Sequence, residues 1–133
     1  SEMCIRDSWK SKEGIKVRGV RDKNGQRIKK EYTDKDGTKV AITYKNAKET
    51  MQTEKYTDGS SSEFSGYDEN GNSTKRVNKD KDGNITSVYT FEFKTNGYYK
   101  VQELDKDGKP IGEPLYRDKD DNKIPKEEYE KAK

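Results

Sequence analysis

Acidic side chains at short spacing are the residues of this 133-residue chain whose types and pattern could bind a metal. Around Asp80 and Asp82, oxygen-bearing side chains alternate and Gly83 follows, as in the first half of an EF-hand calcium loop. The twelfth position of such a loop is a bidentate glutamate, but it is Tyr89 here. Asp80 and Asp82 are therefore only weak candidates for millimolar calcium binding, and turn formation is the favoured role of these aspartates.

The near absence of histidine and cysteine limits the catalytic mechanisms that this chain could use. The chain has no histidine and one cysteine, Cys4. Zinc sites built from Cys and His, and nucleophiles activated by His, are therefore excluded. The many carboxylates fall in expected turns, where nothing would bury a pair of them for acid–base catalysis. We predict a protein that is not an enzyme and that needs no cofactor.

Exposed aromatic residues are the remaining candidates for recognition. Tyr98 and Tyr99 are consecutive, so on a strand they point to opposite faces and one of them faces outward. We identify Tyr98, Tyr99 and Tyr116, together with Trp9, as candidates for contacting a glycan or a peptide. The alternative is that each tyrosine lies on an apolar sheet face with its hydroxyl at the rim.

The composition limits the core and the possible partners. Only 26% of residues are apolar and 41% are charged, which is close to the composition of disordered chains. The apolar residues are nevertheless strand formers in a regular pattern, so we expect a folded protein with a thin core. The 29 basic and 26 acidic residues are interleaved, so no basic stripe indicates a nucleic-acid partner. No apolar run approaches the roughly 18 residues of a membrane span.

A repeated turn signal organises the chain. An acidic or polar run ending in glycine recurs about every 12 residues, and a different turn is expected at residues 45–48. Asp-Gly and Asn-Gly favour hairpins, because glycine adopts a positive φ without strain and the first Asp can accept a backbone N–H two residues later. The expected turn glycines are Gly25, Gly37, Gly59, Gly71, Gly83, Gly97 and Gly108.

Strands of period two fill the intervals between these turns. Residues 84–94 are the longest and most apolar interval, and we expect it at the centre of the sheet, paired with residues 98–104. The expected fold is all-β: an antiparallel meander of about nine strands, as a barrel, a half-barrel or an open spiral sheet, with a short helix after Pro125. The expected buried residues are Val40, Ile42, Tyr44, Tyr89, Phe91, Phe93 and Val101.

We divide the chain into three parts. Residues 1–8 resemble a translated sequencing-adapter scar, so we expect them to be a non-native segment and the true N-terminus to be missing. Residues 9–116 form the predicted β-meander, and residues 117–133 a polar tail with the short helix. Cys4 then carries no information on the redox compartment, and the sequence leaves the oligomeric state open.

Part of the repeat resembles a known family. The runs Tyr67–Thr74 and Asp80–Tyr89 are similar to the YD repeats of RHS-type bacterial proteins, in which Tyr-Asp, Gly-Asn and Thr recur along hairpins. The resemblance implies an extracellular or cell-surface β-repeat and supplies no catalytic residue. We expect a noncatalytic structural or binding module of an exported bacterial protein, with a protein or glycan partner. The alternatives are a small β-barrel that binds an apolar ligand and a weak calcium-binding repeat protein.

Overall fold

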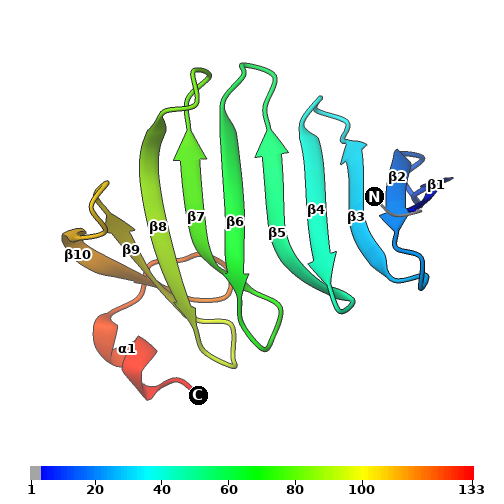
Figure 1. Ribbon diagram of the computed structural model, residues 1–133. Coiled ribbons are helices and arrows are strands. Elements are labelled where there is room, and N and C mark those ends of the chain that lie inside the picture. Colours follow the sequence, from blue (N-terminus) through cyan, green and yellow to red (C-terminus); the bar gives the residue numbers. More distant parts are fainter. Residues whose placement is uncertain (1–3) are drawn as a thin grey trace.

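The computed structural model describes residues 4–133 and contains one antiparallel sheet of ten strands followed by a short helix (Figure 1). Strand order in the sheet is the order in the chain, so each hairpin joins neighbours. The strands are β1 (Ile5–Lys10), β2 (Lys16–Arg21), β3 (Arg27–Thr33), β4 (Lys39–Lys45), β5 (Lys48–Lys55), β6 (Ser61–Tyr67), β7 (Ser73–Lys79), β8 (Ile85–Phe93), β9 (Tyr99–Leu104) and β10 (Pro110–Arg117), and the helix is α1 (Lys126–Lys131).

The sheet is open, because β1 and β10 each pair with one neighbour and not with each other. The all-β meander and the C-terminal helix are confirmed, and the open sheet is the shape found. The pairing of β8 with β9 is also confirmed, but the central position expected for β8 was wrong, because it is the eighth of the ten strands. The strand beyond the expected nine is β1, which begins at Ile5 within the segment 1–8 that was expected to be non-native. A turn at Ser11–Ile15 joins it to β2, with Ser11 in the place of the usual aspartate and Gly14 at φ 83°.

The repeated turn has one geometry, shown by the loop from Asp80 to Asn84. The Asp80 N–H donates to the Asn84 carbonyl at 2.9 Å, and the Gly83 N–H donates to the Asp80 carbonyl at 3.0 Å. Asp80 Oδ1 accepts the N–H groups of Asp82 and Asn84 at 2.9 and 3.0 Å. This is a three-residue hairpin loop whose last residue, Gly83, has φ 85°. All seven predicted turn glycines have positive φ.

The β4–β5 turn has different chemistry, as expected. Asn46 and Ala47 have φ 53° and 67°, which corresponds to a two-residue loop with both central residues left-handed. At the C-terminal end, the loop from Asp118 to Asn122 repeats the three-residue geometry with Asp121, at φ 68°, in the glycine position.

Cross-strand pairing separates the side chains onto two faces, since directly opposed residues point to the same side. Register aligns Tyr32 with Val40, Arg76 with Tyr89 and Phe91 with Val101, and we call this side the aromatic face. The other side aligns Lys39 with Lys55 and Glu92 with Lys100, and we call it the lysine face.

Burial is sparse and concentrated at the N-terminal end of the aromatic face. Val17, Val40 and Ile42 are buried there, and Tyr129 of α1 is the other buried apolar residue. The expected burial of Val40 and Ile42 is confirmed. The expectation for Tyr44, Tyr89, Phe91, Phe93 and Val101 was wrong, because these side chains are only half-buried. In a single-layer sheet no second layer covers them, so only neighbours on the same face can.

Helix α1 packs on the lysine face at the C-terminal end. The Tyr129 hydroxyl donates to the backbone carbonyl and the carboxylate of Glu92, both at 3.0 Å, and its ring lies 5.1 Å from that of Tyr116. Lys94 Nζ lies 4.7 Å from the centre of the Tyr129 ring. Burial, together with the bond to Glu92, raises the pKa of Tyr129 well above its usual range.

Candidate functional site

The structure does not bring the candidate tyrosines into one surface. Tyr116 pairs with Lys100 on the lysine face, where the Tyr129 ring covers it. Burial and the neighbouring Glu128 carboxylate of α1 raise the pKa of Tyr98, which places Tyr98 beside the same helix. Tyr99 points to the opposite, aromatic face, where it is opposed to Phe93. Trp9 lies in β1, at the far end of the sheet.

Tyr99 belongs to an aromatic cluster on β8 and β9. Its ring centre lies 6.0 Å from that of Phe91 and 5.3 Å from that of Phe93. Its hydroxyl donates to Asp121 Oδ1 at 2.7 Å. Partial burial and this hydrogen bond raise the pKa of Tyr99 to about 12. The three rings are half-buried, and Leu115 on the neighbouring strand β10 is 41% exposed.

The candidate calcium ligands lie in the turn between β7 and β8. One carboxylate oxygen of Asp80 accepts two backbone N–H groups, and Asp82 is exposed at the tip. These contacts are those of a closed turn, as the sequence favours. Within residues 4–133 no group of three or more His, Cys, Asp or Glu side chains gathers as a metal-binding cluster.

A polar network crosses the middle of the aromatic face, and sequence reasoning missed it. Ser62 is 1% exposed, and its hydroxyl donates to Asn78 Oδ1 at 2.7 Å. Arg76 donates to the same Asn78 oxygen at 2.9 Å, and the Asn78 amide donates to Ser87 at 2.8 Å. Serine is a weak predictor of burial, so only the register of β6 against β7 could have identified Ser62 as a buried residue.

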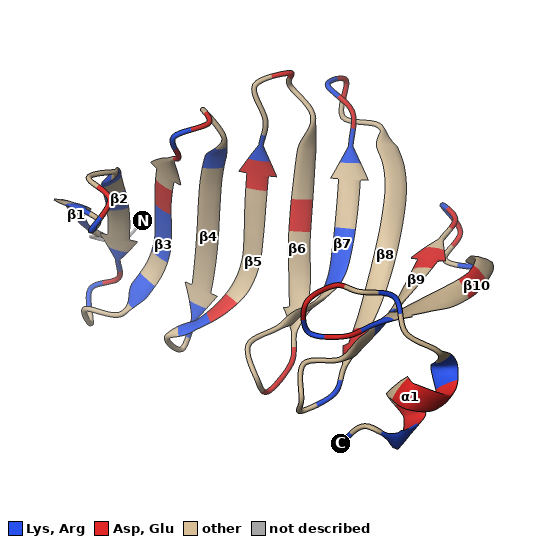
Figure 2. Ribbon diagram, turned by 180° about the vertical axis from the view of Figure 1, so that it is seen from behind, with Lys and Arg blue, Asp and Glu red and all other residues tan. Residues whose placement is uncertain are grey.

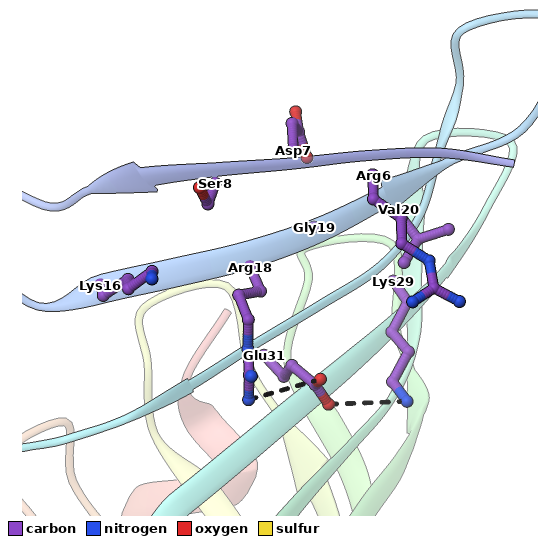
Figure 3. Close-up of a pocket in the computed structure, with 9 residues that line it drawn as sticks. All are labelled: Arg6, Asp7, Ser8, Lys16, Arg18, Gly19, Val20, Lys29 and Glu31. Atoms are coloured by element: carbon purple, nitrogen blue, oxygen red, sulfur yellow. Dashed lines mark ion pairs between the residues drawn. The ribbon is translucent and has the colours of Figure 1, made fainter.

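A surface depression lies on the lysine face near the N-terminal end (Figure 3). It has a volume of about 460 Å³, and β1, β2 and β3 contribute its lining. Arg18 and Lys29 flank Glu31 there, with nitrogen–oxygen distances of 3.8 and 3.6 Å, and Arg6 and Lys16 also line the depression. A second depression of about 210 Å³ shares Arg18 and Glu31 and continues to β4 and β5.

Basic residues form a row across the lysine face at one level of the sheet. We call it the lysine row, and its members are Lys10, Lys16, Lys39, Lys55 and Lys79. Lys10 is directly opposed to Lys16, and Lys39 to Lys55. Basic residues are visible at the same ends of β4, β5 and β7 in Figure 2.

Two hydroxyl side chains complete the row. Thr33 is opposed to Lys39, and Ser61 lies between Lys55 and Lys79. The pairing of Val17 with Tyr32 places Lys16 level with Thr33, so the alignment continues from β1 to β7. The interleaved sequence hides this arrangement, because period-two alternation and hairpin register together place these lysines on one face.

Comparisons with known proteins do not assign the chain to a family. No protein-family model matches the sequence, and no curated protein matches it. Within residues 4–133 no helix is long and apolar enough to cross a membrane.

Proposed function

We propose that this chain is a noncatalytic β-repeat module of an exported bacterial protein and that it binds a partner through the faces of its sheet. The observation that carries the proposal is the single-layer architecture. Ten strands form one open sheet, and few side chains in it are buried. A catalytic site usually lies in a concave pocket where functional groups converge. The depressions here are lined by the open faces of strands, which supports contact with an extended partner instead.

Two features support a location at the cell surface or outside the cell. The YD-like runs lie in β6 to β8, within the hairpin array, which agrees with the implication of the resemblance. Charged residues, which make up 41% of the chain, are also prominent in the turns and at the strand ends (Figure 2). Recovery of the full open reading frame tests this part of the proposal. A secretion signal or further repeats is the expected result, and an intracellular fusion partner would contradict it.

The binding role is tested with the purified chain on a defined glycan and peptide array. We expect saturable binding to at least one class of ligand, and mass spectrometry should recover that ligand unchanged. Recovery of a cleaved or otherwise modified ligand would show catalysis and overturn the proposal. If nothing binds, the sheet acts as a structural spacer only.

A further inference from the structure

Four of the five lysines in the lysine row form no ion pair within residues 4–133, whereas Lys79 Nζ lies 2.8 Å from Glu63 Oε2. Lys39 and Lys55 are directly opposed and exposed, and neither forms an ion pair within residues 4–133. The same holds for Lys10 and Lys16. Directly opposed like charges destabilise a sheet. An anionic ligand lying over the row would remove this repulsion, so the row is complementary in charge to a polyanion.

The shape of the row selects a linear ligand. Neighbouring strands are about 4.8 Å apart, so a row that crosses from β1 to β7 is about 29 Å long. At the turn end it is bordered by the aspartates of the hairpin loops, among them Asp34, Asp58 and Asp80. These carboxylates repel an anion, so the ligand is confined to the direction across the strands.

The chemistry of the row favours a polysaccharide over other polyanions. Thr33 and Ser61 place hydroxyl groups among the ammonium groups, and both types of group hydrogen-bond to carboxylates and sugar hydroxyls. Same-face neighbours such as Ala41 and Thr53 are small and not aromatic, so they offer no platform for stacking nucleic-acid bases. The members are lysines rather than arginines, whose planar fork suits phosphate groups.

We propose that the lysine row binds a linear acidic polysaccharide, with successive carboxylates lying over Lys16, Lys39 and Lys55. This inference rests on the proposed binding function and names its ligand class and its residues. The two depressions beside the row both include Arg18 in their lining. Arg18 is the next residue after Lys16 on the same face of β2, one position farther from the loops, so its guanidinium group contacts the same ligand. Binding through ammonium groups exposed to solvent weakens as salt increases.

The test measures the affinity of the whole chain for polygalacturonate, with its methyl-esterified form as the uncharged counterpart. We expect binding to the free acid at low salt, loss of binding to the ester, and progressive weakening with sodium chloride. The double substitution Lys39→Gln and Lys55→Gln should weaken binding at least tenfold. Its thermal midpoint should stay the same or rise, because a repulsive pair is removed.

A matched control removes the same charge elsewhere. Lys23→Gln with Lys106→Gln changes two exposed turn lysines and should alter the affinity by less than about twofold. Equal losses in the two double variants would overturn the lysine row as the site. Equal or tighter binding of single-stranded DNA or of anionic vesicles would overturn the polysaccharide as its ligand. The outcome that separates the two proposals is a ligand from the array that the double variant, with Lys39→Gln and Lys55→Gln, binds with unchanged affinity. In that case this inference fails while the proposed binding function stands.

Discussion

The two ends of the aromatic face differ in burial although they belong to the same sheet. At the N-terminal end, Val40 and Ile42 are 4% and 5% exposed. At the C-terminal end, Phe91 and Phe93 are larger but only half-buried. The short branched side chain of Ile42 is directly opposed to the longer Lys30, whose Nζ lies 6.0 Å from the centre of the Tyr44 ring. Burial in a single layer therefore depends on the height of neighbouring side chains more than on hydrophobicity.

The largest expected effect is at the N-terminal end. Ile42→Ala removes a side chain that is 5% exposed and should lower the free energy of unfolding by about 3 kcal/mol. Urea denaturation followed by circular dichroism measures the change. Ile111→Ala in β10 is the control, since Ile111 is 47% exposed and its truncation should cost less than about 1 kcal/mol. Similar costs at the two positions would refute the difference in burial.

A smaller effect is expected at the C-terminal end. Phe91→Ala removes the ring contacts with Phe93, at 6.1 Å, and with Tyr99, at 6.0 Å. Because the ring is half-buried, the expected cost is about 2 kcal/mol rather than the 3–5 kcal/mol of a fully buried phenylalanine. The same urea experiment decides the order. A cost above that of Ile42→Ala would mean that the aromatic cluster, and not the N-terminal end, is the main core.

Two turns test whether the ends also differ in how tightly the loops pack. Gly37 and Gly83 both have φ 85°, so alanine at either position should cost about 1 kcal/mol in backbone strain. A Cβ at Gly83 meets no atom within 4 Å, whereas one at Gly37 would lie 2.8 Å from Thr57 Cγ2. Gly37→Ala should therefore cost more by about 0.5 kcal/mol.

The excess at Gly37 has its own control. Thr57→Ser removes the Cγ2 methyl group, so in that background Gly37→Ala should cost no more than Gly83→Ala. Thermal melts of the four variants give the comparison. An excess that persists in the serine background would assign the cost to the backbone alone.

The smallest expected effect is the pH dependence of the C-terminal end. Burial and the Asp121 hydrogen bond raise the pKa of Tyr99 from 10.0 to about 12. A raised folded-state pKa means that the stabilisation is complete below pH 10 and is lost as the pH rises toward 12. Urea melts at pH 9 and pH 11.5 should show a smaller decrease for Tyr99→Phe than for the wild type. An equal decrease would show that Tyr99 does not contribute to the alkaline loss of stability.

The turns were the predictable part of this fold. Each Asp–Gly loop carries its own determinants, because Asp80 hydrogen-bonds residues two and four positions later and Gly83 supplies the positive φ. Once the loops are known, alternate residues must share a face, and the strands follow. The turn at Gly14 was missed because Ser11 replaces the aspartate that marked the other copies.

Burial and the candidate site were less predictable, because they depend on register between strands. The burial of Ser62 follows from its position opposite Asn78 and beside Arg76, which no local pattern reveals. The lysine row likewise needs Lys39 opposed to Lys55, and that pairing depends on the two-residue loop at Asn46 and Ala47. Longer-range register is set by loop length, so an error of one residue would exchange the faces.

The form of β10 bears on whether copies of the protein can polymerise. Pro110 and Pro114 lack N–H donors, the register shifts between Ile111 and Leu115, and the Ile124 N–H bonds back to the Tyr116 carbonyl. A fibril that grows by joining sheets edge to edge requires two strands that can each accept a neighbour. Because the edge of β10 is poorly suited to pairing, concentrated solutions of the protein should resist fibril growth despite the long open sheet.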